Sequence, residues 1–201
     1  MSITLTTGST MSIAKTYSPA LGSAGTTITA ISNASPASVT ATHSLSIGDY
    51  VLISSSWGLL DHRVCRVQGV TGTTAFTLEG VDTSDTTKYP ATTGVPATFR
   101  KITAWSQLSQ VKGVSASGGA QQFADITSIT DTVKRQIPTI KDAVAMTIDV
   151  YDDPTLSWYA DVSAADDARS PYALKMDFAN GSKLVANAYW SILDVPTMAQ
   201  N

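Results

Sequence analysis

Short runs in which apolar and polar residues alternate fill the chain from about residue 26. They are separated by Gly-bearing turns and read TTITAI, DYVLIS, HRVCRVQGV and AFTLEG. A period of two that is bounded by turn residues is typical of half-buried strands. We therefore expect residues 26–95 to hold a small β-barrel-like or sandwich-like module of four or five strands, which ends in the linker VDTSDTTKYPATTGVP.

The second half of the chain, residues 96–201, returns to this alternation. It resumes in ATFRKITAW and SQLSQVKGV, and the later run VAMTIDV predicts a strand over 144–150 whose residues Val144, Met146, Ile148 and Val150 share one buried face. The last runs, YALKMDF and KLVANAYW, flank the turn ANGS. Asn-Gly between alternating runs predicts a tight β-hairpin in which both central positions have positive φ. The predicted fold class is therefore mainly β.

One helix interrupts the strands. Asp153-Pro154 reads as an N-cap followed by proline at the first helical position, and Ser170-Pro171 provides a stop. A single amphipathic helix is therefore expected over about 155–168. The residues expected to share its apolar face are Leu156, Tyr159, Ala160 and Ala164.

A long polar excursion over residues 113–142 separates two of the predicted strands. Loops longer than roughly 12–15 residues are uncommon in compact domains unless they are disordered or serve binding or assembly. This one carries spaced apolar residues, which would have little to bury against in solvent, and charges of both signs, which favour a protein partner over phosphate. We therefore expect an arm that docks on another subunit, with a solvated loop as the alternative. The residues of this expected interface are Phe123, Asp125, Ile126, Ile129, Asp131, Val133, Lys134, Arg135, Ile137, Pro138 and Ile140.

Composition narrows the range of partners. The formal net charge is −3 and only 14% of residues are charged, so no cluster of Lys and Arg is available to grip a phosphate backbone. The N-terminus lacks the basic start and apolar core of a secretory signal, and no run is long enough to span a membrane. We expect a protein without a membrane anchor that is made in the cytoplasm. Residues 1–25 are small and polar and are expected to form a mobile N-terminal arm.

The candidate chemical sites have weak signatures. His43 and His62 lack the compact ligand spacing of a zinc site, and Asp82-Thr83-Ser84-Asp85 lacks the rest of a calcium-binding loop. The sequence contains no G-x-S-x-G nucleophile motif. Cys65 is the single cysteine and lies in a strand-like run, which favours a packed thiol. We therefore expect no enzymatic activity, no metal and no cofactor.

Together these elements resemble the tail tube proteins, or major tail proteins, of long-tailed bacteriophages. The resemblance covers about half of the chain, from roughly Phe99 onward. It is carried by Trp105-x-x-Leu108-x-x-Val111-Lys112 at the start of the excursion, the strand 144–150, the helix after Asp153-Pro154 and the hairpin Phe178-Ala179-Asn180-Gly181-Ser182. The preceding β-barrel-like module also looks like one that some phage tail proteins carry.

The resemblance implies a tail-tube-like β-sandwich or barrel with one flanking helix, in a virion protein made in the host cytoplasm. Copies would join into hexameric rings that stack as a tail tube, with other tail proteins at the tube ends. Genomic DNA would pass through the lumen without specific binding, and the long arm would reach the neighbouring ring. Family members usually continue after the hairpin to a final strand, whereas this sequence stops soon after Trp190. That strand is then absent, or an N-terminal strand takes its place, or the sequence is a shortened version.

The rival hypothesis is a β-sandwich binding module, such as a carbohydrate-binding or adhesin-like protein of a tail tip. It would require exposed aromatic side chains that could stack on a sugar. The candidates are Trp57, Tyr89, Trp158, Tyr159 and Trp190. An enzyme is the third hypothesis and has the least support in the sequence.

Overall fold

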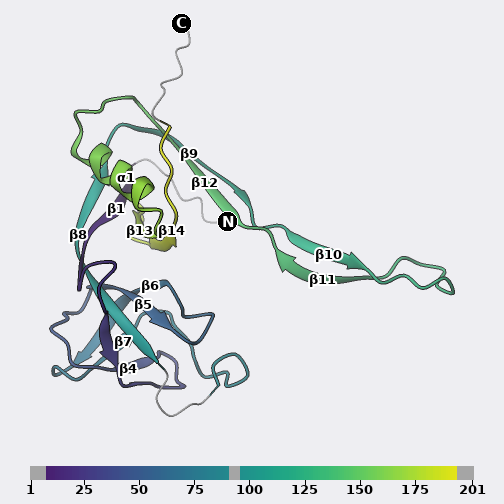
Figure 1. Ribbon diagram of the computed structural model, residues 1–201. Helices are drawn as coiled ribbons and strands as arrows, with labels where there is room; N and C mark the ends of the chain where they lie inside the picture. The colour runs from purple at the N-terminus through teal and green to yellow at the C-terminus, as the bar shows by residue number, and fades with distance from the viewer. Residues whose placement is uncertain (1–7, 91–95, 194–201) are drawn as a thin grey trace, which may run out of the picture. The chain divides into compact units, whose positions relative to one another are not determined.

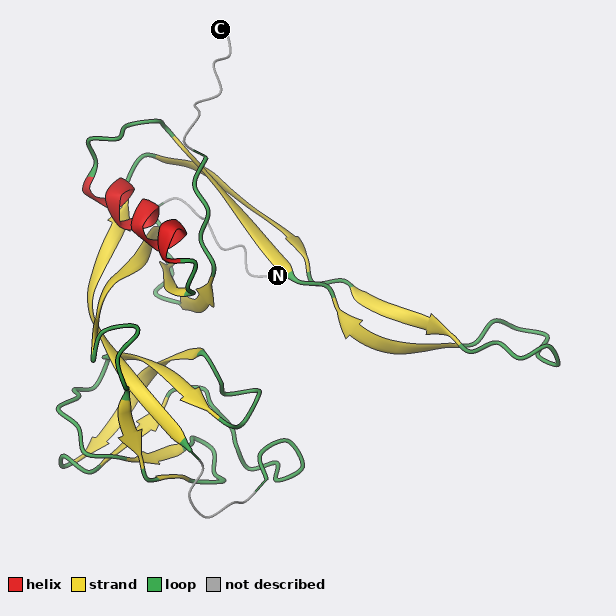
Figure 2. Cartoon of the chain, viewed as in Figure 1, coloured by secondary structure: helices red, strands yellow, loops and turns green. Residues whose placement is uncertain are grey.

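The computed structural model describes residues 8–90 and 96–193, which form fourteen strands and one helix (Figures 1 and 2). The mainly β fold with a single helix that the sequence predicts is confirmed. The chain divides into two units: unit 1 is Met1–Leu108 with Pro154–Asn201, and unit 2 is Ser109–Asp153. Unit 1 contains β1 (Thr10–Ser18), β2 (Thr26–Ile28), β3 (Ala30–Ile31), β4 (Ser38–Thr40), β5 (Tyr50–Ser55), β6 (Arg63–Thr71), β7 (Ala75–Leu78), β8 (Ala97–Leu108), α1 (Ser157–Ala168), β13 (Tyr172–Asp177) and β14 (Lys183–Ala188).

Strands β2 to β8 close into a small barrel. The antiparallel ladder runs β8–β5–β6–β7–β4–β3, and β2 pairs with the other edge of β8. Strands β2 and β3 are separated only by Thr29, whose backbone N–H and Oγ1 both donate to the Thr40 carbonyl oxygen at 2.9 Å. The hydrogen-bonded circuit is therefore complete, and the predicted barrel-like module is confirmed. Closure matters because it leaves no free edge on this part of the sheet.

The barrel encloses one apolar core, to which the expected linker contributes. Val81 and Tyr89 are buried in this core, and Tyr89 packs edge-on against Trp57 with ring centroids 5.4 Å apart. Thr83 is fully buried, and its Oγ1 donates to the Ser32 carbonyl oxygen at 2.6 Å. Residues 81–90 are thus part of the barrel and not a separate linker, while residues 91–95 of that expected segment lie outside the described residues.

Strands β5, β6 and β8 form a wall that is buried on both sides. Val51 and Ile53 of β5 face the barrel core, whereas Tyr50 and Leu52 face a second core on the outside of the barrel. This explains why YVLI is a continuous apolar run and not an alternating one, since a strand covered on both faces needs apolar residues at every position. The wall extends into residues 96–201 through β8, so the expected boundary at residues 95/96 falls just before a strand that both cores share.

The second core lies between this wall and an open sheet in the order β14–β13–β1–β8. Strand β1 pairs with β8 through Met11↔Leu108 and with β13 through Met11↔Met176. The expectation of a mobile arm over residues 1–25 is therefore wrong for Thr10–Ser18, and residues 1–7 lie outside the described residues. The apolar residues Met11, Ile13, Ala14 and Tyr17 of this strand are buried, whereas the small polar residues around them made the segment resemble an arm. Strand β1 therefore occupies a position in this sheet, between β8 and β13.

Helix α1 covers β1 and β8 and differs in detail from its expected form. It begins at Ser157, and its N-cap is Leu156 without a side-chain hydrogen bond, so the expected capping by Asp153-Pro154 is wrong. Its buried face consists of Trp158, Val162 and Ala165. Of the face expected from spacing, Ala160 and Ala164 are exposed. The indole of Trp158 has the largest apolar area on the helix, so it sets which side turns inward.

The hairpin of β13 and β14 has the expected pairing with a different turn. The ladder ends at Asp177↔Lys183, and the N–H of Gly181 donates to the Phe178 carbonyl oxygen at 2.9 Å. Gly181 has a φ of 84°, whereas Asn180 does not have a positive φ. The connection is therefore a three-residue turn with glycine in the left-handed position, and not the two-residue Asn-Gly turn that the sequence predicts.

A buried hydrogen bond between β1 and β13 gives a test of this sheet. The N–H of Ala173 donates to the hydroxyl oxygen of buried Tyr17 at 2.9 Å. Replacing Tyr17 by Phe removes the acceptor and leaves that N–H unpaired, so we expect the free energy of unfolding to fall by about 1–3 kcal/mol in urea titrations at pH 7. The matched change Tyr189→Phe, at an exposed side chain, should leave it unchanged. Equal stability of the two variants would contradict the buried role of Tyr17.

The same residue predicts a pH dependence. Burial raises the pKa of Tyr17 from 10.0 to about 12. A raised pKa means that this contribution to stability is complete below pH 10 and is lost as the pH rises from 10 to 12, where the unfolded chain ionises first. We therefore expect the stability difference between the wild-type protein and Tyr17→Phe to shrink over this range. A difference that stays constant to pH 12 would contradict the assignment.

Candidate assembly surface

Unit 2 consists of two short antiparallel ladders, one after the other along the chain (Figures 1 and 2). The first pairs β9 (Val111–Gly118) with β12 (Val144–Val150), and we call it the ribbon. The second pairs β10 (Gln121–Asp125) with β11 (Gln136–Lys141), and residues 126–135 form the tip that joins them. The strand expected over 144–150 is present, and much of the excursion over 113–142 is strand instead of loop.

A glycine separates the two ladders. Gly118 ends β9 with a φ of 84°, and a Cβ at this position would lie 2.0 Å from the Ala143 carbonyl oxygen. No residue with a side chain fits there without moving the opposite strand. The N–H of Asp142 then donates to the Ala120 carbonyl oxygen at 2.9 Å, so the chain ends of the second ladder are already held together.

No residue of unit 2 is buried. Eleven of the sixteen most exposed large apolar side chains in the described part of the chain belong to it, from Val114 to Tyr151. The expectation that 144–150 has a buried face is therefore wrong within a single chain, where Val144 is 71% exposed and Met146 is 37% exposed. The physical reason is that a two-stranded ribbon has no layer to cover either of its faces.

The ribbon nevertheless has two chemically different faces. Directly opposed residues share a face, and the register pairs Met146 with Ala116 and Ile148 with Val114. The complete apolar face is Val111, Val114, Ala116, Val144, Met146, Ile148 and Val150. The opposite face has small and polar residues, namely Gly113, Ser115, Ser117, Ala145, Thr147 and Asp149. Such a pattern is that of a sheet with one side covered and the other in water.

Both long edges of the ribbon are also unpaired. Among the described residues β9 pairs only with β12, and β12 only with β9. Neither strand contains proline, which would block pairing, and each is seven or eight residues long. Long edge strands with free N–H and C=O groups are templates for pairing with another chain. The ribbon thus offers an apolar face and two hydrogen-bonding edges.

The second ladder carries the interface residues that the sequence predicts. Phe123 lies opposite Pro138, and the tip exposes Ile129 completely. The acidic residues shape the tip: Asp131 Oδ2 accepts the N–H of Ser128 at 2.8 Å, with Arg135 Nε at 3.8 Å from Oδ1. The eleven predicted residues therefore lie on one continuous segment of unit 2, and all of them are exposed except Asp131, which is half-buried.

Asp125 has a comparable role at the base of the tip. Its Oδ1 accepts the N–H of Thr127 at 2.8 Å and the Thr127 hydroxyl at 2.5 Å, and these hydrogen bonds lower the pKa of the Asp125 carboxyl. The tip has a defined shape with apolar side chains outside. The sequence predicted the apolar face of β12 but took it to be buried within the chain, because a pattern does not tell which chain covers it.

The ribbon and the second ladder lie within a stretch of the chain that matches a known protein family. The family described as "Phage tail tube protein, TTP" matches residues 55–201. The chain belongs to this family of phage tail tube proteins. No curated protein and no solved structure matches it. The match begins at the last residue of β5 and includes all of unit 2.

Family membership makes the protein a structural component of a phage tail. A tail tube protein assembles with copies of itself and with other tail proteins, and its place is in the virion. This family is not known for enzymatic activity. The one helix of the described residues, α1, is too short and too polar to span a membrane.

None of the five aromatic residues that the sequence offered for a sugar-binding surface is fully exposed. Trp57, Tyr89 and Trp158 are buried in the tail tube protein. Tyr159 and Trp190 are half-buried, and the Trp190 indole N–H donates to the Tyr172 carbonyl oxygen at 3.2 Å. These five side chains form no exposed stacking platform, which removes the main support for the rival hypothesis.

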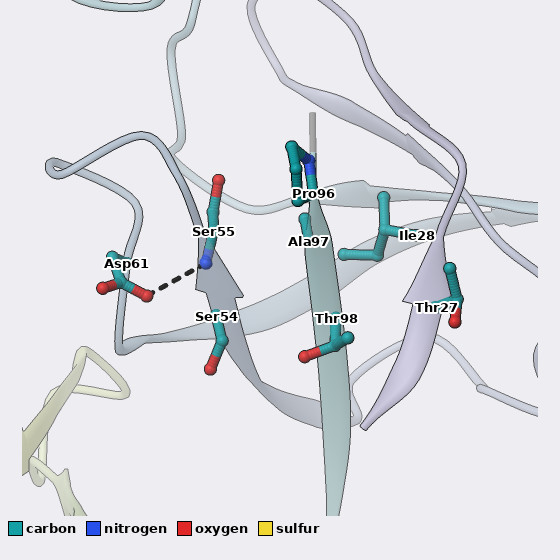
Figure 3. A pocket seen from close by; sticks show the side chains of 8 residues that line it. All are labelled: Thr27, Ile28, Ser54, Ser55, Asp61, Pro96, Ala97 and Thr98. Carbon is teal, nitrogen blue, oxygen red and sulfur yellow. Dashed lines mark hydrogen bonds between the residues drawn. The ribbon is translucent and has the colours of Figure 1, made fainter. Parts of the chain in front are cut away.

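A shallow pocket opens at one end of the barrel (Figure 3). Asp61 is its only charged lining residue, and the close-up shows its carboxylate turned toward the Ser55 N–H, which donates to Oδ1 at 2.9 Å. The same oxygen accepts the N–H of His62 at 3.0 Å, so the carboxylate serves to hold a turn. The lining is Thr27, Ile28, Ser54, Ser55, Asp61, Pro96, Ala97 and Thr98, and it contains no acid–base pair.

The other titratable candidates have structural partners. His43 is buried, and its Nδ1 accepts the N–H of Leu45 at 3.1 Å. Hydrogen bonds from Ser84 lower the pKa of Asp82, and those from Lys88 and Thr87 lower the pKa of Asp85. Within the described ranges no three His, Cys, Asp or Glu side chains gather in a way that could hold a metal ion.

Cys65 provides a test of the barrel core. The thiol is buried among core residues, and burial raises its pKa from 9.0 to about 11. We expect a thiol reagent at pH 8 to modify native Cys65 at least roughly a hundredfold more slowly than the urea-unfolded chain, because both access and thiolate are lacking. The variant Ser117→Cys, which adds an exposed thiol on β9, is the control and should react at once with one equivalent. Fast reaction of both thiols would mean that the barrel opens readily.

Proposed function

We propose that this tail tube protein forms hexameric rings, that the rings stack into the tube, and that genomic DNA passes through the lumen without specific binding. The observation that carries the proposal is the ribbon, whose apolar face and two edges have no cover in a single chain. Exposure on this scale in a protein that assembles with itself favours an interface made of the same segment in every copy. The ring number follows from the resemblance to tail tube proteins.

The edges of the ribbon suit lateral joining. Strands β9 and β12 are antiparallel, so β12 of one copy and β9 of the next can extend the ladder in the same antiparallel sense. This contact is head-to-tail, and repeated rotation by a constant angle closes it into a ring with no edge left over. Closure then satisfies the backbone groups that a free ribbon leaves to water.

The chemistry of the two faces indicates which face of the ribbon turns toward the inside of such a ring and which turns toward the outside. The apolar face is covered by protein on the outer side, because only there can further layers pack on it. The small polar face then lines the lumen. The only charged residue that the register places on this face is Asp149, and a negative lining repels phosphates and lets DNA move without sticking.

The second ladder and its tip serve the contact between rings. Its apolar residues, among them Phe123, Ile129 and Ile140, protrude from a segment whose shape is held by its own hydrogen bonds. Such a preformed projection can fit a groove of the next ring with little loss of conformational freedom. The charged residues Lys134 and Arg135 provide register by pairing with acidic groups at the rim of that contact.

A charge on either face of the ribbon tests the assignment of sides. Met146→Lys places an ammonium on the covered face, and we expect the protein concentration needed for assembly to rise by more than about a hundredfold, since burying an unpaired charge is strongly unfavourable. Thr147→Lys places the same charge one residue away, on the lumen face, and should still assemble. Light scattering and negative-stain electron microscopy measure both. If Met146→Lys forms normal tubes, the proposed covered face is wrong.

Removal of the second ladder tests the contact between rings. Ala120 and Asp142 are already joined by a hydrogen bond, so residues 121–141 can be replaced by a short Asn-Gly turn with little strain. We expect this variant to form single rings and to fail to form tubes, with the thermal unfolding of unit 1 unchanged. Tubes of normal length seen by electron microscopy would contradict the role given to the tip and its eleven residues.

A further inference from the structure

We propose that the free edge of β14 is a docking site for an extended, acidic segment of another tail protein, which adds to the open sheet as a further strand. This edge belongs to unit 1 and is separate from the ribbon and the second ladder. The partner is a different protein and not a copy of this chain. The observations that point to it are the pairing of β14, an unpartnered amide oxygen and the charges beside the strand.

Strand β14 is the last strand of the open sheet. Among the described residues it pairs only with β13, and the register between the two contains no bulge. Strand β6 lies close to β14, yet no ladder joins them. The sequence KLVANA contains no proline, and its one charge is Lys183 at the start. Proteins usually block an edge with proline, a bulge or several charges, so this edge of six residues is suited to pairing with another chain.

The phase of the β13–β14 hairpin shows which backbone groups of β14 are available. The N–H of Phe178 donates to the Ser182 carbonyl oxygen at 2.9 Å, so these two residues form a hydrogen-bonded pair just beyond the ladder. Hydrogen-bonded and non-hydrogen-bonded pairs alternate along an antiparallel ladder. The residues of β14 whose N–H and C=O groups point away from β13 are therefore Lys183, Val185 and Asn187. They present the groups that a further strand needs.

The side chain of Asn187 adds a polar requirement at the same edge. Its Oδ1 atom is shielded from solvent and accepts no hydrogen bond from any described residue. Buried acceptors are nearly always paired, so this oxygen calls for a donor. Side chains that lie opposite each other on neighbouring strands are close enough to form a hydrogen bond. A donor side chain on an added strand can therefore complete this group.

The charges beside the edge favour an acidic segment. Lys175 Nζ lies 3.1 Å from Asp177 Oδ2, and Lys183 Nζ pairs with Oδ1 of the same carboxylate, so two cations share one anion. Arg66 is near enough to repel Lys183 and has its own partner in Glu79 at 2.8 Å. Three cations therefore face two anions here, in a chain whose formal net charge is −3. A carboxylate on the incoming segment complements this local excess of positive charge.

A second copy of this chain does not suit the edge. Antiparallel pairing of β14 with the β14 of another copy is two-fold and sets the two copies head to head, whereas stacked rings share one direction. The edges of β9 and β12 are engaged within the ring. This exclusion rests on the proposed function. A tail tube protein also assembles with other tail proteins, and an extended segment of such a protein can add to β14 by strand addition.

A designed strand peptide tests the site. The probe is a fluorescently labelled peptide of six alternating threonine and valine residues with an aspartate at each end, and fluorescence anisotropy measures its binding to the full chain kept below its assembly concentration. We expect saturable binding that is at least about tenfold weaker when lysines replace the aspartates. A peptide N-methylated at every residue cannot donate to β14 and should not bind.

Two outcomes of this titration contradict the proposal. No saturable binding of the aspartate peptide up to about 1 mM would overturn the docking site. Equal affinity for the aspartate and lysine peptides would overturn the acidic character of the partner.

Charge reversals locate the bound peptide. Lys183→Glu should weaken binding of the aspartate peptide at least about tenfold. Lys183→Gln removes the charge without adding repulsion toward Asp177 and should weaken binding as well, which covers the case that the first variant disturbs the hairpin. Lys112→Glu is the matched reversal at an exposed position of β9 and should leave binding unchanged. Weaker binding to Lys112→Glu alone would place the peptide on the ribbon and overturn the proposal.

Amide hydrogen exchange measured by NMR gives a readout at β14 itself. The N–H groups of Val185 and Asn187 should exchange more than about tenfold more slowly when the aspartate peptide is saturating, whereas that of Ala186, which faces β13, should change little. Unchanged exchange at Val185 and Asn187 would overturn the docking site. Lys183→Glu should still form rings and tubes. Absence of rings and tubes from the wild-type protein would instead overturn the proposed function, whatever the peptide does.

Discussion

Burial of one wall of strands from both sides is the constraint on which unit 1 depends. Strands β5, β6 and β8 must present apolar side chains to the barrel on one face and to the open sheet on the other. Neither core is complete without this wall. A substitution that shifts the wall from the barrel side therefore also alters packing in the sheet that carries α1. Charges at the same junction add to the coupling: the Lys175 ammonium lies 5.1 Å from the centroid of the Trp105 ring and 5.6 Å from that of Tyr50.

Much of this fold was predictable from local patterns. The existence of the barrel strands, β8, the helix and the β13–β14 hairpin follows from local signals that act within a few residues, although the buried face of the helix and the type of the turn do not. The helix cap and the turn type were local errors, and the larger errors are tertiary. Strand β1 was missed because its apolar residues lie among small polar residues that resemble a flexible arm. Residues 81–90 resemble a linker because their buried polar groups, such as the Thr83 hydroxyl, are satisfied by distant backbone atoms. The position of α1 depended on which face the sheet would accept.

The assembly surface shows a different limit of sequence reasoning. Apolar residues in a polar excursion predicted an arm that docks on another subunit; the structure leaves the apolar residues from Phe123 to Ile140 exposed, and the docking stays a prediction. The alternation of β12 was equally clear, and yet it predicts a buried face that the single chain does not provide. The alternation of apolar and polar residues indicates that one face of a strand is covered, but it does not indicate whether the same chain or another chain covers it. In a protein that assembles with copies of itself, the residues whose cover the sequence does not settle are those of the proposed interface.

Strands β9 and β12 differ in how strongly their residues favour strand structure. If both strands were strong strand formers, each free copy would display a stable ribbon with two open edges, and such edges pair indiscriminately. Instead β9 is rich in glycine and serine, which favour strands weakly, whereas β12 is rich in good strand formers. The two buried apolar cores of the described residues both lie in unit 1. Because these cores contain no residue of the ribbon, weak strand preference in β9 leaves them intact.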